Sequence, residues 1–117
     1  MSRRSGRCRI PTDYCLLILD FPGRGDPTPQ IRAAMLALAE SIAGEPGLIW
    51  KLWTHDGPEG QGFGARAGGV YLFDSRAAAE AYHQKHAARL GKAGVTGIEA
   101  TYRRVDEALS RMNRGPL

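Results

Sequence analysis

The stretch "PGLIWKLWTH" (residues 46–55) is an apolar segment of the 117-residue chain and carries both of its tryptophans. Trp50 and Trp53 lie three residues apart, so in a β-strand, where successive side chains alternate, they point to opposite faces. A strand in a small two-layer domain normally needs only one apolar face. The segment therefore predicts a strand that is buried on both sides, each against a different surface.

The neighbouring segments predict a further strand and a helix. Residues 14–21 (YCLLILDF) are apolar almost throughout, which is typical of a strand that is buried on both faces. The following helix can be capped by Thr28, begins with Pro29 at a favoured first position and ends at Gly44. Its apolar face follows spacings of four, three and four residues and consists of Ile31, Met35, Leu38 and Ile42.

The rest of the chain completes an alternating pattern. Four more elements are predicted, namely a strand at 69–74, a helix that is capped by Asp74 or Ser75 and ends near Gly91 or Gly94, a strand at 95–105 and a short helix or turn at 106–113. The order β-α-β-β-α-β is that of the ferredoxin-like α+β fold, an antiparallel four-stranded sheet with both helices on one face. We expect one such domain over residues 14–117, preceded by a basic tail at residues 1–13.

The two expected helices leave one face of the sheet uncovered. In the strand that carries the tryptophans, Leu48, Trp50 and Leu52 point one way and Trp53 points the other way. We assign the first three to the helix side and Trp53 to the opposite side. An uncovered face with a tryptophan would be an unusually large exposed apolar patch. The simplest cover is a second copy related by a two-fold axis, so we expect a homodimer with its sheets packed face to face.

The net charge of +4 is concentrated at one end of the chain. Arg3, Arg4, Arg7 and Arg9 lie in the first nine residues without an acidic neighbour, which leaves 12 of the 16 basic residues against 12 acidic residues elsewhere. A basic tail on a neutral domain is typical of a solvated terminus, and no nucleic-acid-binding motif follows it. We therefore expect neither a nucleic acid nor a membrane as a partner.

Targeting and redox features favour a cytoplasmic protein. No apolar run is long enough to span a membrane, and no signal-peptide apolar segment follows the basic N-terminus. Cys8 lies in the tail and Cys15 in an apolar strand, so these two cysteines do not predict a structural disulfide. We interpret Cys15 as a small core residue.

His86 is the most informative polar residue of the chain. Ala79, Tyr82, His86 and Leu90 follow at spacings of three, four and four, which places His86 in the middle of the inward face of the second helix. It is either a hydrogen-bonded core histidine or a group that lines a pocket between helix and sheet, where it could move a proton. His83 could pair with it on a metal, but no third ligand sits at a telling spacing, so we predict no metal site.

Aromatic side chains and a glycine-rich loop could complete such a pocket. Trp50, Trp53, Tyr71 and Tyr82 would form an aromatic lining if their packing leaves a void, and would otherwise be core residues. The loop at residues 56–67 lacks the spacing and the strand–helix context of a dinucleotide-binding fingerprint. It is either a long hairpin or a lid over a neighbouring pocket.

Three segments also resemble a known family, namely "EPGLIWKLWT", "GGVYLFDSRAAAEAYHQKHAARLGKAGV" and "VDEALSRMN". They are similar to the YdhR-type mono-oxygenases of the dimeric α+β barrel superfamily, which also contains the antibiotic-biosynthesis mono-oxygenases. The resemblance extends over residues 14–113. The residues that recur in order are Trp50, Trp53, the Tyr-Leu-Phe segment at 71–73, His86, Arg89 and Leu90.

The resemblance implies a ferredoxin-like protomer, a barrel-forming homodimer and a pocket between helices and sheet. Superfamily members oxidise aromatic or polycyclic substrates with molecular oxygen, many without metal, flavin or haem, because an electron-rich substrate can itself reduce oxygen. The implied function is a cofactor-independent mono-oxygenase. His86 would take a phenolic proton or hold the resulting anion, and Arg89 would stabilise negative charge. The aromatic residues implied to contact the substrate are Trp50, Trp53, Tyr71 and Tyr82.

Other function classes stay open, and so does the question of whether the chain is an enzyme. The tail before Asp13 and the longer glycine-rich hairpin depart from the family's pattern, so no substrate preference is carried over. The same pocket would also serve a non-catalytic binder or sensor of a small hydrophobic metabolite. Haem binding or degradation ranks lower, because haem-degrading relatives rely on an asparagine in the first strand and the only asparagine here is Asn113.

Overall fold

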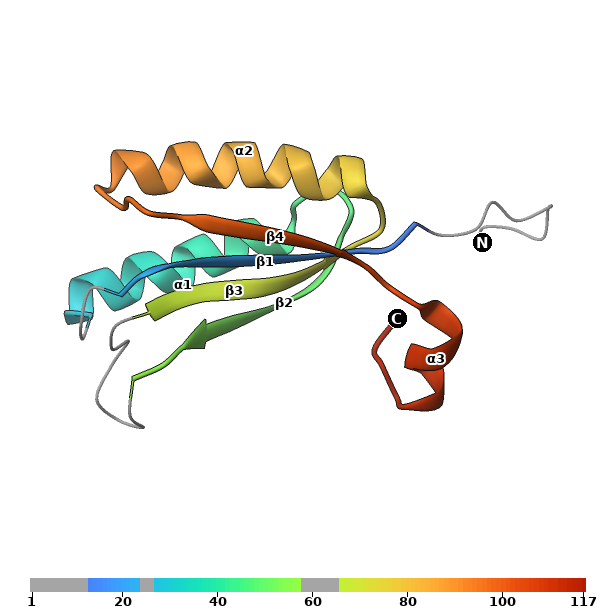
Figure 1. Cartoon of the computed structure of the whole chain (residues 1–117). Coiled ribbons are helices and arrows are strands. Elements are labelled where there is room, and N and C mark those ends of the chain that lie inside the picture. The colour runs from blue at the N-terminus through green and yellow to red at the C-terminus, as the bar shows by residue number, and fades with distance from the viewer. Residues whose placement is uncertain (1–12, 24–26, 58–65) are drawn as a thin grey trace.

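The computed structural model of the chain describes residues 13–23, 27–57 and 66–117. Within these residues the elements follow the predicted order, with a short helix after the last strand (Figure 1). They are β1 (Cys15–Pro22), α1 (Pro29–Ala43), β2 (Leu48–His55), β3 (Arg66–Phe73), α2 (Arg76–Lys92), β4 (Glu99–Arg104) and α3 (Glu107–Met112). The predictions on the arginine-rich tail, on Cys8 and on most of the glycine-rich loop fall outside the described residues.

Local signals set the starts of the helices. Thr28 Oγ1 accepts a hydrogen bond from the Ile31 amide at 3.1 Å, which confirms the predicted cap of α1. Ser75, rather than Asp74, caps α2, because its Oγ accepts a hydrogen bond from the Ala78 amide at 3.1 Å. Each bond satisfies an amide that the first helical turn leaves without a partner.

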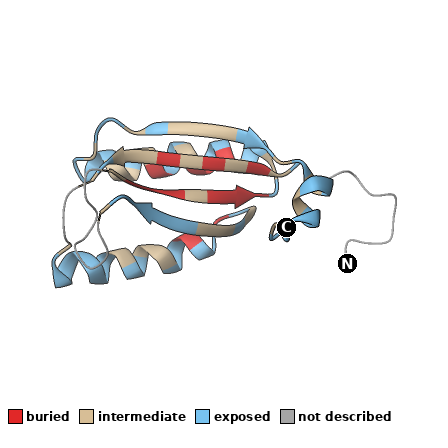
Figure 2. Ribbon diagram, turned by 60° about the horizontal axis from the view of Figure 1, so that its bottom comes forward, coloured by how far each residue is buried: buried red, intermediate tan, exposed pale blue. Residues whose placement is uncertain are grey.

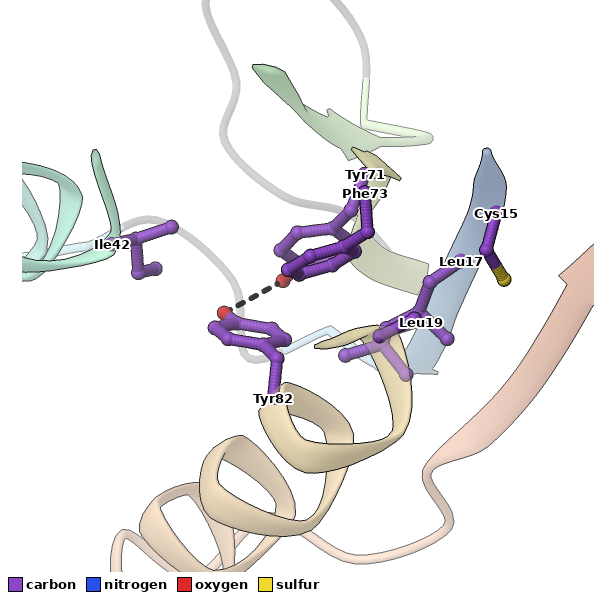
Figure 3. Packing of buried hydrophobic residues seen from close by; sticks show 8 residues of the cluster. Cys15, Leu17, Leu19, Ile42, Tyr71, Phe73 and Tyr82 are labelled. Atoms are coloured by element: carbon purple, nitrogen blue, oxygen red, sulfur yellow. Dashed lines mark hydrogen bonds between the residues drawn. The ribbon is translucent and has the colours of Figure 1, made fainter. Parts of the chain in front are cut away.

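The four strands form one antiparallel sheet in the order β2-β3-β1-β4, which confirms the ferredoxin-like α+β fold (Figure 1). The central strands β1 and β3 carry most of the buried residues of the sheet, whereas the edge strands are largely exposed (Figure 2). In the core, Leu17, Leu19, Tyr71 and Phe73 pack against Tyr82 of α2 (Figure 3). Removing these apolar surfaces from water is the main force that holds the helix to the sheet.

A β-bulge in β2 reverses the face that we predicted for Trp50. Leu48 lies opposite Phe73, but the residue opposite Leu72 is Trp50 rather than Ile49. Since Ile49 is the extra residue of the bulge, every side chain after it changes face relative to a regular strand. The prediction for Leu48 is confirmed, because it packs against the core, and the prediction for Trp50 is wrong.

Beyond the bulge, the remaining side chains of β2 follow the new register. Lys51 and Trp53 lie opposite Tyr71 and Gly69, on the side of the sheet that the helices cover. Leu52 lies opposite Val70, on the other side. The predicted positions of Trp53 and Leu52 are therefore exchanged, although the prediction of an aromatic side chain on each face is confirmed.

The side of the sheet that faces away from α1 and α2 is called the open face. Its apolar centre consists of Leu16, Ile18, Trp50, Leu52, Val70 and Leu72. The chain end reaches this face at one point, where Trp50 Nε1 donates a hydrogen bond to the Pro116 carbonyl oxygen at 2.7 Å. Leu52 stays 59% exposed. The apolar character of the second face is thus confirmed, with Trp50 in the place expected for Trp53.

Helix α1 covers the sheet only with its C-terminal half. Ile31 and Ile42 share the predicted apolar face of the helix, yet Ile42 is 2% exposed and Ile31 is 52% exposed. The start of α1 lies at the same end of the sheet as the end of β2 (Figure 1). Trp53, near that end of β2, is 42% exposed on the helix side. The first turns of α1 thus leave an apolar surface uncovered beside this tryptophan.

Candidate functional site

Six side chains meet between α2 and the helix side of the sheet. We call this group the His86 cluster, and its members are Lys51, Trp53, Tyr71, Tyr82, His86 and Arg89. The last three follow at spacings of four and three on α2, which aligns them along one side of the helix. The cluster contains every predicted site residue except Trp50, which the bulge places on the open face.

Two buried tyrosines join the sheet to α2. Tyr82 Oη donates a hydrogen bond to Tyr71 Oη at 3.2 Å, and the two ring centroids are 4.9 Å apart (Figure 3). Burial raises the pKa of both phenols, so both stay protonated at neutral pH. The two tyrosines are therefore neutral, hydrogen-bonded groups in the buried part of the cluster.

His86 is a buried, neutral histidine with a fixed tautomer. Its ring stacks on that of Tyr82 with the centroids 5.1 Å apart, and Arg89 Nε and Nη2 donate to its Nδ1 at 3.1 and 2.8 Å. Because a guanidinium can only donate, Nδ1 accepts and the ring proton is assigned to Nε2. Desolvation, followed by the charges of Arg89 and Lys51, lowers the pKa of His86 to about 3. At neutral pH His86 can therefore donate a hydrogen bond through Nε2 but holds no positive charge.

Lys51 joins this cluster from β2, and sequence reasoning missed it. Its Nζ lies 3.6 Å from the ring centroid of Trp53 and 4.6 Å from that of Tyr71. Desolvation, followed by the charge of Arg89, lowers the pKa of Lys51 to about 7. The sequence does contain a feature that could have identified Lys51. It is the one charged residue of an apolar strand, and it lies two positions before Trp53 and therefore on the same face.

The backbone of β3 makes room for this lysine. A Cβ atom at Gly69 would lie 2.8 Å from Lys51 Cε, 3.1 Å from Tyr71 Cε1 and 3.2 Å from the Leu52 carbonyl oxygen. Any other residue at this position would push the lysine away from the rings. Glycine here is thus explained by the path of the Lys51 side chain across the sheet.

The one buried carboxylate of the described residues belongs to a different ion pair. Glu45, which follows α1, is buried, and its Oε2 lies 2.8 Å from Lys85 Nζ on α2. Its charge contributes only weakly to the raised pKa of Tyr82 and does not figure among the causes of the lowered pKa values of Lys51 and His86. Sequence reasoning missed Glu45 as well, because a single glutamate after a helix carries no pattern.

The other two histidines are not members of the cluster, although the charge of His83 contributes to the lowered pKa of His86. His83 Nδ1 is 2.7 Å from Tyr102 Oη, so its side chain is engaged by β4 rather than by His86, and His55 lies exposed at the end of β2. Residues 13–23, 27–57 and 66–117 contain no group of three or more His, Cys, Asp or Glu side chains that could hold a metal ion. In the same residues, no helix has both the length and the apolar character to cross a membrane.

Two hollows in the surface lie away from the cluster. One, of about 310 Å³, is lined by Asp13, Tyr14, Cys15, Arg76, Arg103 and Arg104. The other, of about 210 Å³, is lined by Asp20, Thr54, His55, Asp56, Arg66 and Ala67. Neither contains a residue of the His86 cluster, so the cluster meets solvent through the exposed ring of Trp53 and the half-buried side chains of Lys51 and Arg89.

Comparison with known proteins places the chain in a family. A solved structure, that of a protein of unknown function from Nitrosomonas europaea, has a similar fold, with a TM-score of 0.53 and 15% sequence identity over 81% of this chain and 91% of that chain. Among curated proteins, none matches the chain. Residues 16–116 match the model of the family described as "Putative mono-oxygenase ydhR". The match covers most of the chain, which therefore belongs to the YdhR mono-oxygenase family.

Proposed function

We propose that the protein is a mono-oxygenase that transfers one atom of molecular oxygen to a small aromatic or polycyclic substrate at the His86 cluster, without metal, flavin or haem. The observation that carries this proposal is the neutral His86, which Arg89 holds in one tautomer against a pair of buried phenols. Membership of the mono-oxygenase family supports the reaction class. Trp53 supplies an exposed aromatic surface for the substrate ring, and the rings of Tyr71 and Tyr82 form the buried part of the same cluster.

The reaction balances without an added reductant when the substrate is an electron-rich phenol. The phenol loses its O–H proton, and oxygen reacts at a ring carbon that bears one hydrogen. One oxygen atom stays on that carbon as a quinone carbonyl, and the other leaves as water with the two hydrogens that the substrate has lost. The substrate supplies all four electrons that the oxygen molecule accepts.

The protein's contribution to this reaction is electrostatic. Negative charge develops on the phenolic oxygen as its proton leaves, and the Nε2–H of His86 and the guanidinium of Arg89 are fixed donors for such an anion. Of the two roles that the sequence left open for His86, its lowered pKa favours holding the anion over accepting the proton. Donors that are already fixed need no reorganisation during the reaction.

The proposal includes a homodimer that packs through the open face. Leu52, on the edge strand β2, is 59% exposed and belongs to an apolar surface that neither α1 nor α2 covers. A second copy related by a two-fold axis would bury this surface against the same surface of its partner. Light scattering after gel filtration tests this, since Leu52→Glu would yield a monomer if the open face is the interface. A monomeric unmodified protein at micromolar concentration would contradict it.

Oxygen uptake with a panel of polycyclic phenols and anthrones tests the catalytic part. We expect uptake with at least one member of the panel, without added metal or reductant, and its loss in His86→Ala. His55→Ala, which removes an exposed histidine of the same chain, is the matched control and retains activity. Circular dichroism confirms that both variants are folded.

Two results would replace the oxygenase with another function. A hydrophobic ligand that stays bound through purification, together with no oxygen uptake from any substrate, would indicate a binder or sensor. A Soret band after addition of haem, lost in His86→Ala, would indicate a haem protein.

A further inference from the structure

The two basic side chains of the His86 cluster form no ion pair with a carboxylate of the described residues. Among residues 13–23, 27–57 and 66–117, the ion pairs are formed by other basic residues, namely Arg66, Arg76, Lys85 and Arg111. Arg89 instead donates two hydrogen bonds to the neutral Nδ1 of His86, and Lys51 Nζ lies over the rings of Trp53 and Tyr71. Charged groups that are largely withdrawn from water are normally paired, so these two form an unusual site.

The groups around Lys51 do not neutralise it. From α2 it is approached by Arg89 and by the neutral His86, and from β3 by the protonated phenol of Tyr71. Glu45 is paired with Lys85, and its charge is not among the causes of the lowered pKa of Lys51. Two like charges in a half-buried site repel each other, and an anion placed between them would relieve this repulsion and replace the lost hydration.

The same site presents a flat aromatic surface beside the cations. Trp53 is 42% exposed while its ring contacts Lys51, and the uncovered first turns of α1 lie at this end of the sheet. A planar ring can stack on an exposed tryptophan while a substituent reaches the neighbouring charge. The surface thus matches a ligand that is aromatic and negatively charged at the same time.

We propose that the substrate of this site is an aromatic anion, either an aryl carboxylate or a phenolate, whose charge is paired by Lys51 and Arg89 and whose ring lies against Trp53. The proposal rests on the proposed function only in placing the substrate at the His86 cluster. When the substrate arrives as a neutral phenol, its O–H proton passes to the neutral amine of Lys51, which leaves a phenolate beside an ammonium ion. Lys51 then acts as the base and, together with Arg89, as a counter-ion of the phenolate.

A pair of probes that differ in charge alone tests this proposal. Binding of 2-naphthoate and of its neutral isostere 2-naphthamide to the full chain is measured by isothermal titration calorimetry at pH 6, where Lys51 is protonated. We expect naphthoate to bind about tenfold or more tightly than naphthamide, since a hydrogen bond to a charged group contributes about 1.5–3 kcal/mol. The preference falls between pH 6 and pH 8 as Lys51 loses its proton.

Two substitutions assign the effect to Lys51. Lys51→Met keeps the length of the side chain but removes its charge, so it lowers the affinity for naphthoate about tenfold and leaves that for naphthamide unchanged. Lys51→Arg keeps the charge and retains the preference for naphthoate. This variant therefore shows that the effect of Lys51→Met comes from the lost charge and not from misfolding. Lys92→Met makes the same chemical change at an exposed lysine near the end of α2 and has no effect.

Three outcomes would overturn the proposal: equal affinity for the two probes, no binding of either at millimolar concentration, or equal effects of Lys51→Met and Lys92→Met. None of them depends on oxygen chemistry. Charge-selective binding without oxygen uptake from any aromatic anion would leave the site assigned and overturn only the proposed oxygenase. Oxygen uptake that is unaffected by Lys51→Met would overturn the role of Lys51 and leave the proposed oxygenase in place.

Discussion

The two faces of the sheet use their apolar residues in different ways. On the helix side, apolar side chains alternate with groups that can gain or lose a proton. Burial displaces the pKa values of six of these groups, namely Cys15, Lys51, Tyr71, Tyr82, His86 and Tyr102. The open face has a centre of aliphatic side chains and one tryptophan, with its charged residues at the rim. Shifted pKa values are typical of functional sites, and exposed apolar patches are typical of interaction surfaces. In our proposals, the reaction site and the dimer interface therefore lie on opposite faces of one sheet.

The largest expected difference between the faces concerns the core. Phe73 is fully buried on the helix side, so Phe73→Ala removes a large side chain and lowers the free energy of unfolding by about 3–5 kcal/mol. Leu52→Ala, on the open face, costs under about 1 kcal/mol in a monomer, because that side chain is already largely in water. Urea denaturation of both variants at two protein concentrations checks this.

Concentration makes this comparison informative for assembly. If a second copy covers the open face, the loss in Leu52→Ala grows as the protein concentration rises, whereas the loss in Phe73→Ala is already large at the lower concentration. A large loss in Leu52→Ala that is independent of concentration would contradict the view that this face is exposed in the monomer.

The next effect comes from the hydroxyl pair on the helix side. Tyr82→Phe removes the donor to Tyr71 Oη and leaves a buried hydroxyl without its partner, which lowers the free energy of unfolding by about 1–3 kcal/mol. The double variant Tyr71→Phe/Tyr82→Phe replaces both partners with apolar rings and recovers part of this loss. A double-mutant cycle from urea unfolding measures the coupling, and strictly additive losses would show that the bond contributes nothing.

The sequence predicted the elements well and the faces of one strand badly. Caps such as Thr28 and the helical spacing that turns His86 inward are local signals, so they were correct. The single-residue bulge at Ile49 has no such signal, because it arises from how β2 pairs with β3. One inserted residue exchanged Trp50 for Trp53 in the site and brought Lys51 beside it. The pairing of Arg89 with His86 also depends on packing, since the three-residue spacing allows the contact but does not require it.

A smaller effect on the helix side is the response of stability to acid. The pKa of His86 is lowered from 6.5 to about 3 in the folded protein, so between these values the unfolded chain binds a proton that the folded protein does not. Stability is therefore unaffected by this group above pH 6.5 and falls as the pH drops below it. The contribution is about 1.4 kcal/mol at pH 5.5 relative to pH 7.5.

Thermal or urea unfolding between pH 5.5 and 7.5 measures this slope. His86→Gln keeps a polar side chain without a titrating ring, so the difference between the two proteins isolates His86 from the carboxylates that titrate at lower pH. Parallel pH profiles would contradict a buried neutral His86. The open face contributes no such group, because its centre consists of Leu, Ile, Val and Trp side chains.

The smallest effect is expected at the rim of the open face. Arg66 Nη2 lies 2.7 Å from Asp20 Oδ2 and 3.4 Å from Glu99 Oε1, but the side chains of Arg66 and Asp20 are 37% and 43% exposed. Exposed ion pairs are screened by water and salt, so we expect Arg66→Met to change the free energy of unfolding only slightly, and less at high ionic strength. A double-mutant cycle with Asp20→Asn at low and high salt measures the coupling. If a second copy packs over this rim, it excludes water from the ion pair, and the coupling becomes larger and insensitive to salt. The measurement therefore also reports whether the open face is covered.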